Sequence, residues 1–292
     1  MLYGGIEAGG TKFVCAIADE KGKLLAQQQC PTATPEETLS QVIRFFHRHL
    51  AEGWELQSIG IASFGPAEVR PEAENYGEIG ATPKKGWSGV NLVHYVKQAL
   101  HLPVVFDTDV NGAMWGEARW GAARGLKTAL YITVGTGIGG GAMVEGQLLH
   151  GIRHPEMGHL IIPHDRLRDP FAGICPFHGD CLEGLASGRA LALRWGRPAE
   201  DLPSEHPAWS LEAHYLGLAL TAYILTLAPQ RIVMGGGVMK QSILFPLVRD
   251  EVARLLSDYY PLPPLEQYLV PPALRDRAGV LGAIALAMDA HG

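Results

Sequence analysis

The sequence is poor in cysteine and has no excess of positive charge. Four cysteines occur among 292 residues, at positions 15, 30, 175 and 181. That is too few for a disulfide framework, so we expect a reducing, cytoplasmic setting. The net charge is −6, and Lys and Arg form no basic patch along the chain. This balance argues against nucleic acid as a partner.

Segments typical of membrane proteins are also missing. The first residues, MLYGGIEAGG, lack the basic region and the long apolar core of a signal peptide. Residues 213–230 contain no Asp, Glu, Lys or Arg, but they include His, Tyr, Thr and Gly. A membrane span needs about 20 predominantly apolar residues. We therefore predict a buried helix here, capped by Ser210 and ended near Pro229, and no membrane partner.

Glycine, by contrast, is abundant: it accounts for 36 residues, well above the usual share of about 7%. Three tracts lie at the ends of predicted strands: GIEAGGTK (5–12), TVGTGIGGG (133–141) and MGGGVM (234–239). We predict that a helix begins directly after the third tract. Glycine lets backbone N–H groups approach an anion without a Cβ in the way. The spacings match neither the P-loop nor the Rossmann fingerprint. The tracts predict phosphate-binding loops, with ordinary tight turns as the alternative.

The alternation of strand and helix patterns predicts an α/β fold. Apolar strands are expected at 2–7, 12–18, 23–29, 58–63 and 103–107, and helices at 35–52, 90–100 and 109–120. After Gly125 the opening pattern returns, with a strand at 129–134, a glycine turn at 135–141 and a strand at 142–145. This repeat suggests two related halves, each a sheet packed with helices. We predict domains at 1–117 and 118–277, with a final helix, 278–292, packing back on the first.

The segment FDTDVNGA (106–113) contains the candidate general base. Asp107, Asp109 and Asn111 follow a predicted buried strand and begin a helix. Ligands bind beyond the carboxyl ends of strands in open α/β sheets. A carboxylate there can accept the proton of a hydroxyl that attacks a phosphoryl group. The alternative is that Asp109 only caps the helix.

A compact group of histidine and cysteine indicates a metal site. Cys175, His178 and Cys181 have the spacing C-x2-H-x2-C, and His159 lies upstream. Two thiolates and two imidazoles form a closed tetrahedral zinc set that leaves no open position. On the residues alone, His154 and His164 are rival fourth ligands. A structural zinc would brace Glu156 and Glu183, which flank the ligands.

Together these motifs resemble the ROK family of sugar kinases and repressors over essentially the whole chain. GIEAGGTK and TVGTGIGGG resemble its two phosphate loops, TDVN its catalytic segment, and HPEMGH with CPFHGDCLEG its zinc signature. The resemblance implies an actin-like (ribonuclease-H-like) ATPase fold with two domains around a cleft. It also implies His159, rather than His154, as the zinc ligand.

The resemblance further implies a role for each matching residue. Asp109 would be the catalytic base, and Thr108, Asn111, Glu156 and Glu183 would lie near the sugar. The residues implied near the nucleotide and its phosphates are Gly9, Gly10, Thr11, Lys12, Thr133, Gly135, Thr136, Gly137, Gly235, Gly236 and Gly237.

Three departures from the common ROK pattern resemble the bacterial fructokinase branch. Glu7 replaces an Asp, Thr108 replaces an Asn, and the zinc segment contains a His in place of one Cys. This implies an ATP- and Mg²⁺-dependent fructokinase with structural Zn²⁺, acting as a homodimer. The alternatives are a kinase for mannose or another hexose and a non-catalytic sugar-binding protein. A repressor would carry an N-terminal helix-turn-helix, whereas here the first phosphate-loop strand begins at Leu2.

Overall fold

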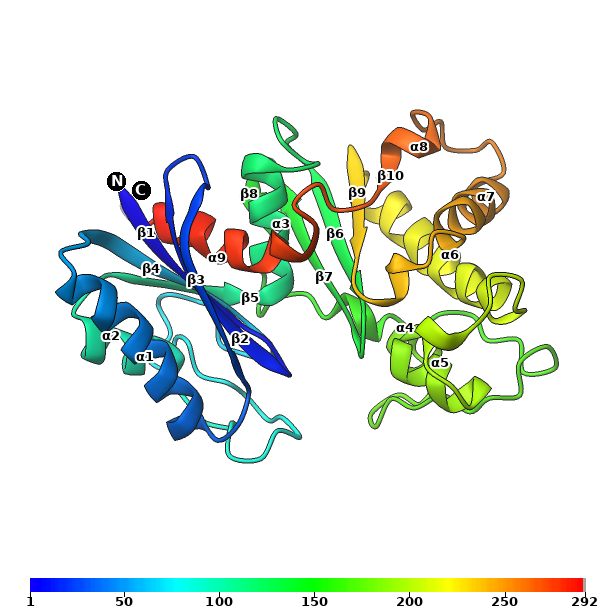
Figure 1. The fold of residues 1–292 in the computed structure, drawn as a ribbon. Coiled ribbons are helices and arrows are strands. Elements are labelled where there is room, and N and C mark those ends of the chain that lie inside the picture. The colour runs from blue at the N-terminus through cyan, green and yellow to red at the C-terminus, as the bar shows by residue number, and fades with distance from the viewer. Residues whose placement is uncertain (291–292) are drawn as a thin grey trace. The chain divides into compact units, whose positions relative to one another are not determined.

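The computed structural model describes residues 1–290. As predicted, three hairpin-connected strands open the chain. β1 (Leu2–Ala8) pairs antiparallel with β2 (Lys12–Asp19), which pairs antiparallel with β3 (Leu24–Pro31). On its other side, β1 pairs in parallel with β4 (Leu56–Ser63), which pairs in parallel with β5 (Val104–Thr108). The first sheet therefore has the order β3-β2-β1-β4-β5. Figure 1 shows it among its helices.

Helices cover both faces of this sheet because its strands alternate apolar residues between the two sides. Phe13 and Cys15 of β2 pack in the core beneath α1 (Pro35–Ala51) and α2 (Leu92–Leu100). Val14 and Ala16, which point the other way, pack against Val280. On that face lie α9 (Ala278–Met288) and its neighbour α3 (Asp109–Trp120). The last two residues of the helix predicted at 278–292 lie outside the described residues.

Helix α9 lies very close to the strands. A Cβ at Gly60 of β4 would overlap the backbone carbonyl oxygen of Ala283 and lie 2.7 Å from the amide nitrogen of Ala287. A Cβ at Gly282 would likewise overlap the carbonyl group of Gly112 in α3. Glycine at these positions therefore serves close packing between backbones, a use that the sequence alone did not reveal.

The second sheet repeats the topology of the first. Its order is β10-β9-β6-β7-β8, with β6 and β7 antiparallel and β6 and β9 parallel. Read from the other edge, this matches the first sheet strand for strand, which confirms the predicted internal repeat. Its strands are β6 (Ala129–Val134), β7 (Ile138–Val144), β8 (Gln147–Leu148), β9 (Arg231–Gly235) and β10 (Leu269–Val270).

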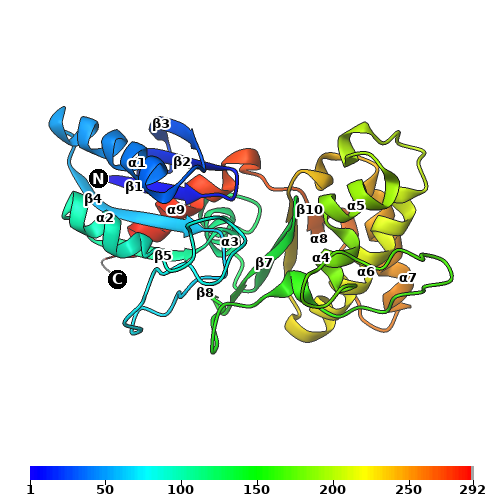
Figure 2. The same ribbon diagram turned by 90° about the horizontal axis from the view of Figure 1, so that it is seen from below.

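The helices that accompany the second sheet lie between β8 and β10 in the chain and can be traced in Figure 2. They are α4 (Leu182–Ala186), α5 (Gly188–Trp195), α6 (Ala208–Leu227), α7 (Leu244–Leu256) and α8 (Leu265–Tyr268). Within residues 1–290, four 3₁₀ turns complete the elements: η1 (Met157–His159), η2 (Ala199–Asp201), η3 (Val238–Lys240) and η4 (Arg275–Arg277).

Three local predictions were wrong. The glycine turn expected at 135–141 is shorter, because residues 139–141 lie inside β7, where Gly140 packs against Met157 and Ile132. Ser210 does not cap α6, which begins at Ala208; its hydroxyl donates to the Pro207 carbonyl instead. The third glycine tract leads into the short turn η3 rather than a full helix.

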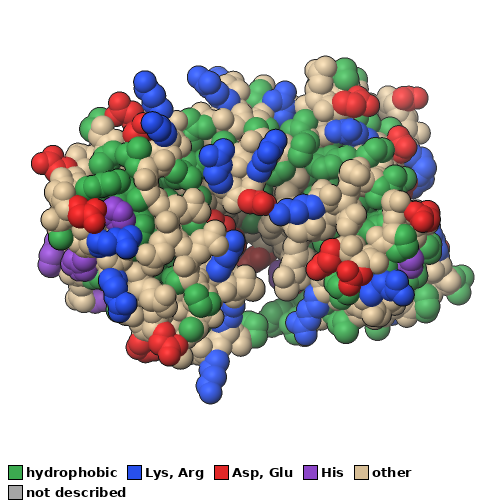
Figure 3. Space-filling model, in the orientation of Figure 1, with side chains coloured by type: hydrophobic (Ala, Val, Ile, Leu, Met, Phe, Trp, Pro, Cys, Tyr) green, Lys and Arg blue, Asp and Glu red, His purple; other side chains and the backbone are tan. Residues whose placement is uncertain are grey.

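The chain divides into two compact units. The first comprises residues 1–125, 148–154 and the described residues from 273 onward, and the second comprises 126–147 and 155–272. Among the described helices, none has the length and apolar character needed to cross a membrane. On the face shown in Figure 3, basic side chains are interspersed with acidic ones.

The close approach of α9 to the sheet generates the first prediction. Gly60→Ala should destabilise the fold by roughly 1–3 kcal/mol, because the added methyl group cannot fit against the Ala283 carbonyl. Gly151→Ala is the control, since the nearest atom to its new Cβ would be 3.9 Å away. Thermal denaturation of both variants tests this, and equal melting temperatures would contradict it.

Candidate functional site

Polar side chains of the first unit gather at one edge of its sheet. Because β1, β4 and β5 are parallel, their carboxyl ends lie at the same edge. Glu7 is the penultimate residue of β1, and Asp109 directly follows β5. This is the edge where open α/β sheets bind ligands.

The first glycine tract forms a tight turn at this edge. The Gly9 N–H donates to the Lys12 carbonyl at 3.1 Å, and Thr32 anchors the turn by donating its hydroxyl to the Gly9 carbonyl at 2.8 Å. The Lys84 ammonium group donates to the Gly10 carbonyl. Sequence reasoning missed Lys84, because it belongs to an irregular segment whose position no periodicity predicts. Lys84 places a positive charge beside the predicted phosphate loop.

The segment TDVN begins α3, and Thr108 rather than Asp109 is the cap. The Asn111 N–H donates to the Thr108 hydroxyl at 3.2 Å. Asp109 is the first residue of the helix, so the alternative that it is the N-cap is wrong. Its carboxylate accepts a hydrogen bond from the N–H of Val110 at 2.9 Å. The Thr108 side chain, predicted to lie near the sugar, caps the helix that carries the candidate base.

A hydrogen-bonded network that joins buried Asp107 and Asn111 to exposed His150 supports this junction. His150 Nε2 lies 2.8 Å from one carboxylate oxygen of Asp107, and the Asn111 amide donates to the other at 2.8 Å. The hydrogen bond to Asp107 raises the pKa of His150, against the opposing effect of burial. The Asn111 side-chain oxygen is buried and has no hydrogen-bond partner among the described residues. Sequence reasoning missed His150, since its partner is distant in the chain.

Glu7 has an unusual electrostatic environment. Burial raises its pKa to about 7, and the negative charge of Asp109 acts in the same direction. Lys12 and a hydrogen bond from the backbone N–H of Val280 oppose this rise. In this environment a nearby cation would stabilise the ionised carboxylate of Glu7, and the raised pKa favours its protonated form.

In the second unit the other two glycine tracts lie against each other. The Gly135 N–H donates to the Gly137 carbonyl at 2.9 Å, which closes a short turn between β6 and β7. Gly236, with a φ of +94°, abuts the backbone of Val134 so closely that no Cβ would fit. Thr133, Thr136 and Gly137 therefore lie in the same part of this unit as Gly235, Gly236 and Gly237.

Glu183 also reaches this turn. Its carboxylate accepts a hydrogen bond from the Ile138 N–H at 2.9 Å, directly beside Gly137. The next helix adds a second tie, from the Gly188 N–H to the Gly135 carbonyl at 2.7 Å. Glu156 immediately precedes η1, whose Gly158 lies against the carbonyl of Ile138.

The four predicted metal ligands converge. The ligand atoms of His159, Cys175, His178 and Cys181 all lie within 4.8 Å of one another. The Cys175 sulfur is 3.5 Å from His159 Nδ1 and 3.6 Å from His178 Nδ1, and the Cys181 sulfur is 3.6 Å from His159 Nδ1.

The rival ligands lie outside this cluster, which makes His159 its fourth member. His154 Nε2 accepts a hydrogen bond from the Ala67 N–H at 3.4 Å. His164 lies 3.0 Å from both the Asp180 carboxylate and the Asp169 carbonyl.

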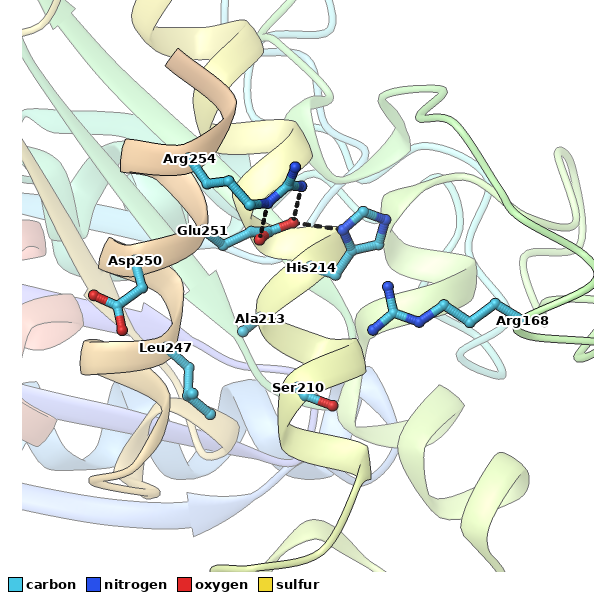
Figure 4. Close-up of a pocket in the computed structure, with 8 residues that line it drawn as sticks. All are labelled: Arg168, Ser210, Ala213, His214, Leu247, Asp250, Glu251 and Arg254. Atoms are coloured by element: carbon cyan, nitrogen blue, oxygen red, sulfur yellow. Dashed lines mark hydrogen bonds and ion pairs between the residues drawn. The ribbon is translucent and has the colours of Figure 1, made fainter. Parts of the chain in front are cut away.

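A cavity of about 450 Å³ in the second unit contains none of the predicted site residues. Figure 4 shows Arg254 and His214 converging on the carboxylate of Glu251 from α7 and α6. The hydrogen bonds from Arg254 hold the pKa of Glu251 at about 2. The contact between His214 and Glu251 joins α6 to α7, so we assign this pair to packing rather than to catalysis.

Comparison with known proteins identifies the family. The model of the ROK family matches residues 3–290. The chain belongs to the ROK family. A fructokinase from Zymomonas mobilis is 45% identical over 99% of this chain and 97% of its own length. A fructokinase from Lactococcus lactis subsp. cremoris is 42% identical over 98% of this chain and 97% of its own length.

Solved ROK structures confirm the predicted fold class. A ROK hexokinase from Thermus thermophilus matches with a TM-score of 0.81 and 28% identity, covering 99% of this chain and 98% of its own. A ROK glucokinase from Streptomyces griseus, solved with glucose and AMPPNP, matches with a TM-score of 0.76 and 26% identity over 99% of both chains. The fold is thus the actin-like ATPase fold of ROK sugar kinases.

The environment of Glu7 generates the second prediction. Its pKa in the folded protein lies above the ordinary value of 4.5, so ionisation of Glu7 opposes folding. The corresponding stability is fully present below pH 4.5 and is lost as the pH rises through about 7. Glu7→Gln cannot ionise. The melting temperature of the variant minus that of the native protein should therefore be larger at about pH 8 than at about pH 5.

Thermal melts at both pH values test this. Glu74→Gln, which removes an exposed carboxylate, is the control for the loss of one negative charge. A Glu7→Gln difference that is the same at both pH values would contradict the assigned pKa of Glu7.

Proposed function

We propose that this ROK protein is an ATP-dependent fructokinase that forms fructose 6-phosphate. The observation that carries the proposal is its near full-length similarity to fructokinases at 42% and 45% identity. The glucokinase of known structure is less similar, at 26%. Glu7, Thr108 and His178 are the three departures that resemble the fructokinase branch, which agrees with this choice.

Asp109 is the proposed general base. It stands at the start of α3, beyond the carboxyl end of β5, and Thr108 relieves it of the capping role. Its carboxylate would take the proton of the sugar's 6-hydroxyl as that oxygen attacks the γ-phosphate of ATP. The unpartnered side-chain oxygen of Asn111, two residues along, can accept a hydrogen bond from a sugar hydroxyl. The roles of Glu156 and Glu183 toward the sugar rest on the resemblance alone.

The glycine turns are the proposed phosphate-binding elements. Their backbone N–H groups, with the hydroxyls of Thr11, Thr133 and Thr136, can donate to phosphate oxygens. Lys12 and Lys84 supply positive charge at the first turn. Gly235, Gly236 and Gly237 would border the nucleotide in the second unit.

A divalent cation fits the carboxylates of the first unit. Glu7 and Asp109 repel each other, as the raised pKa of Glu7 reflects, and carboxylate oxygens are the ligands that Mg²⁺ prefers. These two residues would hold it. When bound, Mg²⁺ neutralises charge on the phosphoryl oxygens.

The His–Cys cluster fits structural zinc. Tetrahedral bonds of about 2.3 Å to sulfur and about 2.0–2.1 Å to nitrogen place neighbouring S and N ligands about 3.6 Å apart. The sulfur–nitrogen distances of 3.5, 3.6 and 3.6 Å agree with this value. Four protein ligands leave no position for water, so the zinc braces the loop rather than taking part in catalysis.

The sugar remains the finer part of the proposal. Mannose or another hexose is the alternative substrate, and kcat/KM values across a hexose panel with ATP and Mg²⁺ separate them. Highest efficiency with fructose supports the proposal, and a clear preference for another hexose replaces it. The homodimer that the resemblance implies stays a prediction.

The third prediction tests the base. Asp109→Asn should lower kcat by about 10²–10⁴-fold, because the amide cannot accept the proton. The dissociation constant for the sugar, measured by calorimetry, should change little. Asp258→Asn is the control: Asp258 is exposed, and its left-handed backbone conformation (φ +60°) suits Asn as well as Asp. Near-native turnover of Asp109→Asn would remove Asp109 from the mechanism.

The fourth prediction tests the metal. Protein purified without added metal should contain one zinc per chain by elemental analysis, and Cys181→Ser should lower both zinc content and melting temperature. Cys30→Ala, a buried cysteine outside the cluster, should leave zinc content unchanged. A stable native protein that contains no zinc would refute the assignment.

A further inference from the structure

Gly279 occupies a position where the backbone does not require glycine. It is the second residue of α9, and its φ lies outside the left-handed range. The reason for glycine here is space. A Cβ at 279 would overlap the carboxyl carbon and one carboxylate oxygen of Glu7 and would lie 3.0 Å from its Cγ. The side chain of Glu7 thus fills the volume that any other residue at 279 would need.

The start of α9 also provides a hydrogen bond to the carboxylate of Glu7. The backbone N–H of Val280, in the first turn of α9, donates a hydrogen bond to it. The first N–H groups of a helix have no partner within the helix, and a negative charge there is stabilising. An aspartate at position 7 would be shorter by one methylene. The extra length of Glu7 and the missing side chain at 279 are therefore complementary.

We propose that Gly279 is a positioning residue for Glu7: the absence of a Cβ at 279 lets the longer carboxylate lie in the first turn of α9 and holds it beside Asp109. The charged groups that face Glu7 are Asp109 at the start of α3, Lys12 at the start of β2 and Asp276 in η4. Moving the Glu7 carboxylate changes the field at the proposed base without altering the base itself. This inference deepens the proposed kinase function and rests on it for one of its readouts.

A double-mutant cycle tests the fit. Gly279→Ala should lower kcat by about 100-fold, since displacing a group by about 1 Å at an active site has a cost of that size. Glu7→Asp should lower kcat less, because the shorter side chain loses its contact with Val280 but is not pushed aside by a new methyl group. In the double variant Glu7→Asp/Gly279→Ala, the new methyl group takes the volume that the shorter side chain vacates. Its kcat should therefore exceed that of Gly279→Ala, instead of falling by the product of the two single effects.

A second readout does not need turnover. Carbon-13 NMR of labelled glutamate carboxyls at one fixed pH, with Glu7→Gln to assign the signal, reports the surroundings of the Glu7 carboxyl group. In Gly279→Ala this signal should move, whereas the control Gly151→Ala should leave it in place, because only a methyl group at 279 overlaps the carboxyl group. The melting temperature should not fall in proportion to kcat, since Ala is favoured over Gly in a helix. Native kcat and an unmoved Glu7 signal in Gly279→Ala would overturn the proposal.

The remaining outcomes also decide it. If Gly279→Ala fails to fold but the double variant folds, the rescue supports the fit between the two residues. If both fail to fold, the shorter carboxylate does not relieve the clash and the proposal is wrong. If the native protein phosphorylates no hexose, the proposed function fails, while the NMR signal of the Glu7 carboxyl group still tests the contact between Gly279 and Glu7.

Discussion

The packing of α9 against the first sheet and α3 is the constraint on which the candidate active site depends. Backbones meet where side chains are absent, at Gly60, Gly116 and Gly282. Glu117 of α3 adds a polar tie, because its buried carboxylate accepts hydrogen bonds from the N–H groups of Ala273 and Leu274, where the chain returns to this unit. The end of the chain thus holds the helix that begins with Asp109, and it brings the first turn of α9 to Glu7.

The repeated sheet topology explains why the glycine turns recur. In each sheet the first strand pairs antiparallel with the next through a glycine turn and in parallel with a later strand. A parallel neighbour brings further strand ends to the edge where the turn lies, so each unit assembles polar residues there. In the first unit these are Glu7 and Asp109. In the second, Gly236 and Glu183 reach the turn after β6.

The His–Cys cluster acts on this second turn through the helix that follows it. Cys181 is the N-cap of α4, and that helix carries Glu183 to the Ile138 N–H. A zinc at the cluster would therefore fix the start of α4 and, through it, the turn at 135–137. The loop is also held by protein contacts alone: the buried Asp169 accepts hydrogen bonds from Arg194 and Tyr215.

The sequence by itself determined the elements and the types of site, because periodicity, turn residues and ligand spacing are local properties of the chain. It predicted the strands of the first sheet, the repeat, three of the metal ligands and the start of α3, while the fourth ligand, His159, came from the resemblance to the ROK family. Only the tertiary structure decided what many of the glycines do, since the sequence shows that a Cβ is missing but not whether a phosphate or a helix lies beside it. It likewise decided that His150 pairs with Asp107 and that Glu7 meets Gly279. Such pairs join residues far apart in sequence, and their contacts exist only once the chain has folded.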